Sequence, residues 1–286
     1  MTEKIMLWNQ HKNLRSYLKT FLIDTDEPRG AVLITPGGGY RIVCEPSEGA
    51  PVAKGFNALG LHAFVLNYRV FPDTYPAPQQ DAMRALKIIR AHAEEWKVKK
   101  DQLGVCGFSA GGNLAATLGT DLVKNIDASD GDASDRESAR PDFIICGQSV
   151  LSFKDDRNQA TSRRWLGQNL QAEEVLKFSP ERHVTADTPP TFLWHTFQDQ
   201  VVHYTHSFLF AQALTDRNVP CELHIFPNGD HGILLGLDTP DVSQWQRLAV
   251  NFIATQTGPV KTPRQNYTHL HQCEASHTYP GELREE

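Results

Sequence analysis

The stretch Leu103–Leu114, LGVCGFSAGGNL, decides the fold. An apolar run ends in a Gly-x-Ser-x-Gly pattern centred on Ser109, and residues 112–122 are typical of a helix. A strand–turn–helix setting of this kind exposes a serine hydroxyl as a nucleophile at the amino end of a helix. Because the turn is tight, the residues flanking Ser109 must lack bulk, and glycines stand at 107 and 111. The bare pattern also fits an ordinary Gly-rich strand–helix turn, so the rest of the chain has to decide.

An acid and a histidine follow Ser109 in the order that this turn requires. Asp199 stands in a polar turn directly after an apolar run, 190–197, which predicts a buried strand. His231 stands in a Gly-rich loop after a second predicted strand, 221–226. Because loops at the carboxyl ends of parallel strands open at the same edge of a sheet, the three side chains can converge.

A serine nucleophile needs both of these partners. We expect His231 to accept the proton of Ser109 as a general base and to return it to the leaving alcohol as a general acid. We expect Asp199 to hold the imidazole in the correct tautomer and to stabilise the imidazolium. Asp187 and Asp230 are rival acids. Asp199 is favoured, because a carboxylate adjacent to His231, such as Asp230, rarely hydrogen-bonds to it in that orientation.

A triple glycine, Gly37–Gly39, follows a predicted strand over 31–35 and Pro36. Glycines expose backbone N–H groups without side-chain obstruction, so these donors and the N–H of Ala110 can meet a developing alkoxide, as in an oxyanion hole. A flexible loop and a phosphate-binding loop are the alternatives. A phosphate loop calls for a lysine or a G-x-G-x-x-G continuation, and the sequence has neither at this point.

Five stretches carry a family resemblance: ITPGGGY at 34–40, VLNYRV at 65–70, YPAPQQDAMRALKIIRAHAEEW at 75–96, LGVCGFSAGGNLAA at 103–116 and NGDHG at 228–232. Together they make the chain resemble the α/β-hydrolase superfamily. Within it, the chain is similar to small esterases related to acetyl xylan esterases and to hormone-sensitive-lipase-like carboxylesterases. The resemblance spans most of residues 30–255 and implies a mostly parallel eight-stranded sheet with helices on both faces and a small cap insertion.

The resemblance also implies residue roles. It gives Ser109 as the nucleophile, Asp199 as the acid and His231 as the base, and it matches the oxyanion donors to Gly38, Gly39 and Ala110. One position departs from the lipase-type pattern, in which the glycine loop often begins with histidine, because Pro36 stands there instead. This departure points to the acetylesterase-like branch.

The organisation of the chain can be predicted coarsely. We expect one α/β-hydrolase domain over residues 1–255 and a C-terminal tail over 256–286, where apolar residues become sparse. The connection over about 148–187 is long for this fold, and it predicts a cap-like insertion that covers the pocket and selects the substrate.

Other segments complete this outline. Residues 18–24 and 31–35 predict a leading hairpin, and residues 52–59 and 78–97 predict helices. The stretch 127–142, rich in Asp, Ser and Ala without periodicity, predicts a mobile surface loop.

Tyr40, Trp165 and His203 are the candidate substrate contacts. Trp165 lies in the insertion and can stack on a sugar or aryl group, with packing of the insertion onto the body as the alternative. His195 and His203 flank Asp199 and are expected at the rim of the pocket. No histidine spacing here fits a zinc motif and the five cysteines form no C-x-x-C, so we expect neither a metal nor a cofactor.

Composition narrows the range of partners. A net charge of −6 over 286 residues makes nucleic acid and anionic membranes unfavourable partners. The sequence has no apolar run of about 18 residues that would span a membrane. Residues 1–10 lack the continuous apolar core of a signal peptide, so we expect a cytoplasmic protein, with a processed secreted form left open. The expected partner is a small-molecule ester, and homo-oligomerisation is left open.

Three functions compete. The first is a serine carboxylic-ester hydrolase acting through an acyl-enzyme on short acyl esters, such as acetylated sugars or xylan fragments. The insertion favours short acyl groups because it has few apolar runs and several charged residues. The charged residues are Asp155, Asp156, Arg157, Arg163 and Arg164. The second is a serine peptidase or aminoacylase on the same fold, which would usually carry an extra domain. The third is a ligand-binding homologue without catalysis. Such proteins commonly lose the serine or the histidine, and this chain has both.

Overall fold

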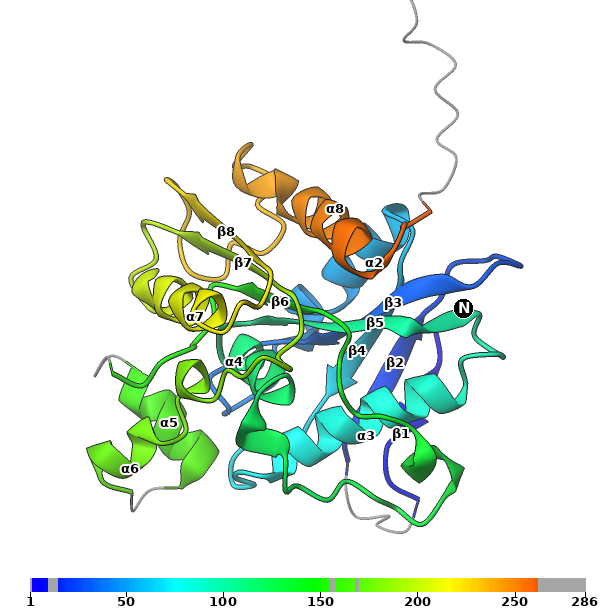
Figure 1. Ribbon diagram of the computed structural model, residues 1–286, viewed down its shortest axis with the longest axis horizontal. Coiled ribbons are helices and arrows are strands. Elements are labelled where there is room, and N and C mark those ends of the chain that lie inside the picture. The colour runs from blue at the N-terminus through cyan, green and yellow to red at the C-terminus, as the bar shows by residue number, and fades with distance from the viewer. Residues whose placement is uncertain (1, 10–14, 155–157, 168–169, 262–286) are drawn as a thin grey trace, which may run out of the picture.

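The structure is a computed structural model that describes residues 2–9, 15–154, 158–167 and 170–261. Its centre is an eight-stranded sheet in the order β1-β2-β4-β3-β5-β6-β7-β8 (Figure 1). The pairs β1–β2 and β2–β4 are antiparallel, and the remaining pairs are parallel. The mostly parallel eight-stranded sheet predicted from the sequence is therefore confirmed. The strands are β1 (Lys4–Met6), β2 (Tyr17–Phe21), β3 (Arg29–Thr35), β4 (His62–Asn67), β5 (Val98–Phe108), β6 (Ile144–Gly147), β7 (Thr191–Thr196) and β8 (Cys221–Phe226).

Helices cover both faces of this sheet, as Figure 1 shows. One face packs against α2 and α8, and the other packs against α3, α4 and α7. In β3 the side chains alternate between the two cores: Val32 and Ile34 face the first, whereas Ala31 and Leu33 face the second. Such strands are apolar at nearly every position because both faces are buried. The main helices are α1 (Glu45–Glu48), α2 (Ala50–Ala58), α3 (Ala77–Ala91), α4 (Ser109–Leu118), α5 (Gln159–Leu166), α6 (Ala172–Leu176), α7 (Thr205–Thr215) and α8 (Trp245–Thr257).

The predicted leading hairpin is wrong. β2 pairs antiparallel with β4, with Tyr17 opposite Asn67, and β3 lies on the other side of β4. β4 is buried at every position except its last, which is half-buried. A strand with the sequence HAFVLN is buried on both faces only when it lies inside the sheet. β4 therefore lies between β2 and β3, and these two strands do not pair as a hairpin.

The segment 127–142 lies against α3. It contains a short 3₁₀ helix, η2 (Ala133–Arg136), whose N-cap Asp132 accepts a hydrogen bond from the backbone N–H of Ser134 at 2.9 Å. The buried Arg84 of α3 donates to the carboxylates of Asp132 and Asp135. These ion pairs attach the segment 127–142 to α3, although its composition alone predicts a mobile surface loop.

The expected tail begins inside a helix, because α8 continues through Thr257. After it, the carbonyl of Gly258 accepts a hydrogen bond from the Gln102 amide at 2.6 Å, and Lys261 pairs with Glu27 at 2.7 Å. Residues 262–286, the rest of that expected tail, lie outside the described residues. Among the helices of the described part of the chain, none has the length and apolar character needed to cross a membrane.

Candidate active site

Ser109 stands at the junction of β5 and α4 with a φ of +51°, a left-handed backbone conformation that is strained for any residue other than glycine. The neighbouring glycines make the turn possible. A Cβ on Gly107 would lie 2.2 Å from the carbonyl oxygen of Gly111, and one on Gly111 would lie 2.0 Å from that of Thr35. The Gly-x-Ser-x-Gly pattern is thus a steric requirement of this turn, and it leaves the Ser109 side chain half-buried at the end of β5.

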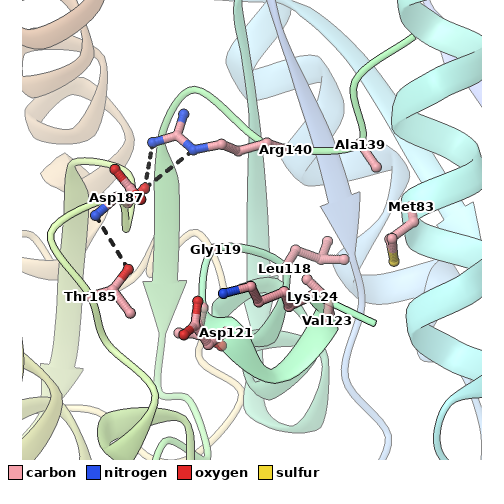
Figure 2. A pocket seen from close by; sticks show the side chains of 11 residues that line it. Met83, Leu118, Gly119, Asp121, Val123, Lys124, Ala139, Arg140, Thr185 and Asp187 are labelled. Atoms are coloured by element: carbon pink, nitrogen blue, oxygen red, sulfur yellow. Dashed lines mark hydrogen bonds between the residues drawn. The ribbon is translucent and has the colours of Figure 1, made fainter. Parts of the chain in front are cut away.

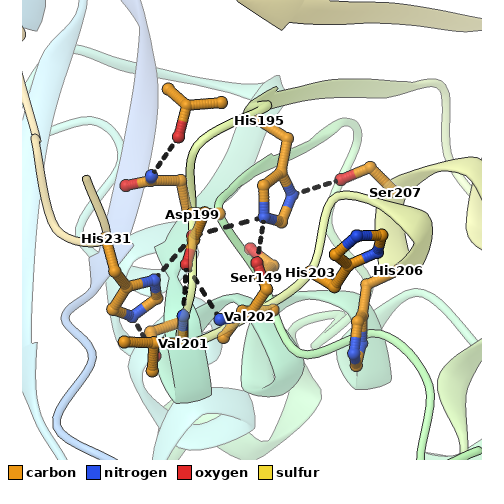
Figure 3. A network of polar contacts seen from close by, with 12 residues as sticks. Ser149, His195, Asp199, Val201, Val202, His203, His206, Ser207 and His231 are labelled. Atoms are coloured by element: carbon orange, nitrogen blue, oxygen red, sulfur yellow. Dashed lines mark hydrogen bonds and ion pairs between the residues drawn. The ribbon is translucent and has the colours of Figure 1, made fainter. Parts of the chain in front are cut away.

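The structure brings together the three residues that the sequence nominated from separate loops. The Nε2 atom of His231 lies 3.0 Å from the Ser109 hydroxyl. Its Nδ1 atom lies 2.7 Å from Oδ2 of Asp199, and Figure 3 shows this contact. A carboxylate only accepts hydrogen bonds, so Nδ1 is the donor to Asp199 and Nε2 is left to accept from Ser109. This is the protonation pattern that a general base facing a serine requires.

Asp199 is held in its ionised form by several donors. Its Oδ1 atom accepts hydrogen bonds from the backbone N–H groups of Val201 and Val202 at 2.9 and 2.8 Å. Burial by itself would raise the pKa of Asp199, but hydrogen bonds from His195 and His231 and the attraction of His231 hold that pKa well below its ordinary value. The carboxylate therefore presents a fixed negative charge to the imidazole of His231.

The rival acids lie elsewhere. Asp230 joins the network through its backbone carbonyl, which accepts a hydrogen bond from the Gln148 amide at 2.9 Å. Asp187 lines a cavity of about 280 Å³ at the far end of α4 from Ser109, shown in Figure 2. There, Arg140 donates to the backbone carbonyl of Asp187 at 2.6 Å. Neither carboxylate is placed at the Nδ1 atom of His231.

The glycine loop after β3 is braced from three sides. The carbonyl of Pro36 accepts a hydrogen bond from the Tyr68 hydroxyl at 2.6 Å, and the carbonyl of Gly37 accepts one from the Cys44 N–H at 2.9 Å. The N–H of Gly37 donates to the carboxylate of Glu48. With Pro36 in place of a histidine, the loop is therefore fixed through its own backbone.

The backbone donors expected at an oxyanion hole have no acceptor within the described residues, at Gly38, Gly39 and Ala110 alike. Gly38 and Gly39 have φ values of +125° and +61°, and a Cβ on Gly38 would lie 2.2 Å from the carbonyl oxygen of Ile42. Ala110 lies in the first turn of α4, where N–H groups have no partner inside the helix. These N–H groups are available to a negatively charged oxygen.

Glu48 is a member of this region that the sequence reasoning missed. It lies at the end of α1, largely buried behind the glycine loop, and burial raises its pKa, partly offset by the Gly37 N–H and by the attraction of His231. No local pattern around Glu48 distinguishes it from a surface glutamate.

Two of the three candidate substrate contacts pack inside the protein. Tyr40 and Trp165 are both fully buried and stack at 5.7 Å between ring centroids. The Tyr40 hydroxyl donates to Asn113 at 2.9 Å, and the Trp165 indole N–H donates to Gln79 at 3.3 Å. Their rings have no free face for a ligand, because the insertion is anchored to the body through them. The expectation of substrate contact is therefore corrected for this pair.

The two histidines expected at the pocket rim differ. His203 is half-buried, and its Nδ1 atom lies 2.9 Å from the Thr205 hydroxyl. His195 is fully buried behind Asp199, so its expected place at the rim is corrected. Its Nε2 atom donates to the Val202 carbonyl at 2.8 Å and lies 3.3 Å from Oδ2 of Asp199, as Figure 3 shows. Within the described residues, His, Cys, Asp and Glu side chains form no group of three or more that could hold a metal ion.

Comparisons with known proteins agree with this geometry. The BD-FAE family model matches residues 24–214. The chain is 33% identical over 247 residues to endo-1,4-beta-xylanase B of Butyrivibrio fibrisolvens. The alignment covers 82% of this chain and 38% of that protein. It is 28% identical over 221 residues to an acetylxylan esterase of Xylanibacter ruminicola, which covers 74% of this chain and 42% of that protein. The chain thus spans about two fifths of the length of these curated relatives.

Solved structures show the same fold over nearly the whole chain. The acetyl ester-xyloside bifunctional hydrolase of Caldicellulosiruptor lactoaceticus superposes with a TM-score of 0.83 at 35% identity, covering 90% of this chain and 97% of that one. An α/β hydrolase from a deep-sea metagenome superposes with a TM-score of 0.70 at 28% identity, covering 90% and 98%. The α/β-hydrolase fold predicted from the sequence is therefore confirmed.

Proposed function

Because this chain belongs to the BD-FAE family, we propose that it is a serine ester hydrolase in which Ser109, His231 and Asp199 act through an acyl-enzyme. The observation that carries the proposal is the continuous hydrogen-bond chain from Asp199 through His231 to the half-buried hydroxyl of Ser109. Each atom in that chain has the donor or acceptor role that the reaction needs.

In the first half-reaction, the Ser109 oxygen forms a bond to the acyl carbon of the ester while its proton passes to Nε2 of His231. The carbonyl oxygen becomes an oxyanion, which the N–H groups of Gly38, Gly39 and Ala110 stabilise. Loss of one such donor typically raises the barrier by about 3–4 kcal/mol. The imidazolium then protonates the leaving alcohol as the ester C–O bond breaks.

In the second half-reaction, water replaces the alcohol. The water oxygen attacks the acyl carbon while His231 takes a proton from the water. His231 then returns that proton to the Ser109 oxygen as the carboxylic acid product departs. Throughout, the Asp199 carboxylate keeps the proton of the imidazole on Nδ1 and stabilises the imidazolium.

We propose short acyl groups on sugars as the substrate class. An acetylxylan esterase and an acetyl ester-xyloside hydrolase are among the relatives. The insertion reaches the glycine loop through a cation, because the Arg164 guanidinium donates to the carbonyl of Gly39 at 3.1 Å. A charged group beside the loop suits a polyhydroxylated leaving group. A long acyl chain gains little there, because each methylene that finds no apolar wall forgoes about 0.8 kcal/mol of transfer free energy.

The test is a panel of p-nitrophenyl esters from two to twelve carbons, run beside a peracetylated sugar and matched amides. We expect kcat/KM to be highest for acetyl and propionyl esters, with acetate released from the sugar. Ser109→Ala should lower kcat by roughly 10⁴- to 10⁶-fold without loss of folding. Faster turnover of the amides would favour the peptidase or aminoacylase alternative, and no labelling by a fluorophosphonate would favour the ligand-binding one. The cytoplasmic location, the domain limits and a homo-oligomer stay predictions.

A further inference from the structure

The segment 148–150, directly after β6, touches the Ser109 turn. The backbone N–H of Val150 donates to the carbonyl of Ser109 at 3.1 Å, and the carbonyl of Val150 accepts from the Asn113 amide at 2.9 Å. Ser149 packs so closely on α4 that a Cβ on Gly112 would lie 1.7 Å from its hydroxyl oxygen. The segment is therefore a fixed part of the wall beside the nucleophile.

The side chain of Gln148 extends from this wall to the loop that carries His231. Its Nε2 atom donates to the carbonyl of Asp230 at 2.9 Å, and its Oε1 atom accepts the N–H of Gly232, also at 2.9 Å. A second hydrogen bond from Nε2, at 2.8 Å, goes to the hydroxyl of Thr196 at the end of β7. One buried amide thus grips the backbone on both sides of His231 and is itself fixed to the strand that leads to Asp199.

The His231 loop needs a restraint of this kind. Gly229 and Gly232 both have positive φ values, +125° and +77°, and glycines allow a loop many conformations. A Cβ on Gly232 would meet nothing within 4 Å, so side-chain packing does not hold the chain at that point. The hydrogen bond from its N–H to Gln148 supplies the restraint that packing leaves out.

The backbone of Gln148 supports the same conclusion. Its φ is +44°, a conformation that residues with a side chain rarely adopt, and its N–H donates to the carbonyl of Trp194 at 3.0 Å. Strain of this kind persists where the surrounding contacts over-determine it. Here it turns a long amide side chain toward the His231 loop.

We propose that Gln148 is a positioning residue that keeps the imidazole of His231 in line with the Ser109 hydroxyl. The inference rests on the proposed function, in which His231 moves the proton of Ser109. Gln148 acts through the backbone of the loop and does not itself touch the reacting atoms. Proton transfer depends on the distance and direction between the side chains of His231 and Ser109. Loss of the hydrogen bonds from Gln148 to the His231 loop therefore lowers the rate of acylation and leaves ester binding unchanged.

The chain offers a matched control. Gln246 of α8 is also a buried glutamine whose amide bonds to a backbone carbonyl, that of Val52, at 3.0 Å, on the face of the sheet that packs against α2. Gln148→Met and Gln246→Met each exchange a buried amide for an apolar side chain of similar length. A purely structural role predicts the same behaviour for the two variants.

The experiment measures kcat and KM for p-nitrophenyl acetate, the rate of fluorophosphonate labelling and Tm, for wild type, Ser109→Ala and both glutamine variants. Assays are run well below the lowest Tm. For Gln148→Met we expect kcat to fall by about tenfold to a hundredfold with KM unchanged, and labelling to slow by the same factor as kcat/KM. For Gln246→Met we expect wild-type kcat and labelling.

The outcomes separate the two proposals. An inactive wild type, or an active Ser109→Ala, overturns the proposed function. An active wild type and inactive Ser109→Ala, with equal kcat in both glutamine variants, overturn the role of Gln148 alone. If Gln148→Met does not fold, Gln148→Asn replaces it with the same readouts. Its amide is one methylene shorter and cannot reach both sides of His231, so a wild-type kcat in that variant overturns the proposal as well.

Discussion

The hydrogen-bond chain from His195 to Ser109 and the ion-pair cluster around Arg84 are both polar networks inside this protein, but they end differently. The first passes from the fully buried His195 through Asp199 and His231 and ends at a half-buried serine hydroxyl. In the second, Arg84 uses Nε on the carbonyl of Leu7 at 3.0 Å, and its two remaining nitrogens on the carboxylates around η2.

The difference separates the proposed catalytic network from a structural one. Every nitrogen of the Arg84 guanidinium is matched by a protein acceptor, and the side chain is 1% exposed, so the cluster joins the N-terminal segment, α3 and η2 with no atom left for a ligand. The other network keeps its last donor, the Ser109 hydroxyl, at the surface of the site. Breaking the Arg84 cluster should cost stability, and breaking the network that ends at Ser109 should cost turnover.

The largest expected effect comes from breaking the proposed catalytic network at Asp199, its proposed acid. Asp199→Asn replaces an acceptor by an amide that can hold the imidazole in the wrong tautomer, so we expect kcat to fall by about 10⁴-fold. Asp230→Asn is the matched control, because the Asp230 carbonyl and not its carboxylate joins the network. Steady-state kinetics with p-nitrophenyl acetate checks both. If Asp230→Asn were the more damaging change, the assignment of the acid would be wrong.

The next effect comes from breaking the structural network. Arg84→Met removes the buried guanidinium that donates to Asp132 and Asp135, and we expect the free energy of unfolding to fall by about 3–5 kcal/mol. Lys100→Met is the control: its ion pair with Glu137 is at the surface, and such pairs contribute about 0–1 kcal/mol. Urea denaturation measures both, and kcat of the folded Arg84→Met protein should match wild type. A loss of kcat at full folding would contradict the separation of the two networks.

The smallest expected effect concerns the pH dependence of stability and comes from His62, a buried histidine remote from the site. His62 accepts the N–H of Ile23 at Nδ1, at 3.0 Å, and donates from Nε2 to the carbonyl of Lys97, at 3.2 Å. Burial lowers its pKa from 6.5 to about 4. Below pH 6.5 the unfolded chain therefore takes up a proton that the folded chain refuses until about pH 4, and stability falls across that interval.

From this shift we expect His62 to remove about 2 kcal/mol of the free energy of unfolding between pH 7 and pH 5, at about 1.4 kcal/mol per pKa unit. The check is urea denaturation at both pH values for wild type and His62→Gln, which cannot titrate. Other groups contribute equally to the two proteins, so the variant should lose less stability than wild type on acidification. Parallel losses would show that His62 is not responsible.

Much of the fold could be read from local sequence. The apolar runs that became β3, the second half of β5 and β7 predict buried parallel strands, because only strands covered on both faces are apolar at successive positions. The place of β4 could not be predicted. β2 and β3 are close in sequence and favour a hairpin, but the burial of both faces of β4 puts it between them.

The sequence by itself determined which residues are proposed to carry the chemistry at the edge of the sheet. A turn as tight as that around Ser109 admits only glycine at 107 and 111, so local sterics write the motif directly into the chain. The triple glycine is a steric signal of the same kind, because Gly38 and Gly39 have positive φ values. The acid and the histidine are recognised instead by their residue types and by their places after successive strands.

Tertiary structure alone decided what surrounds that chemistry. Gln148 lies 84 positions from Gly232, whose N–H it accepts, and nothing in either segment announces the other. The same is true of Glu48 beneath the glycine loop and of His195 behind Asp199. The sequence could not assign Tyr40 and Trp165 for the same reason: an aromatic side chain serves a ligand or a core equally well, and only the packing around it decides which.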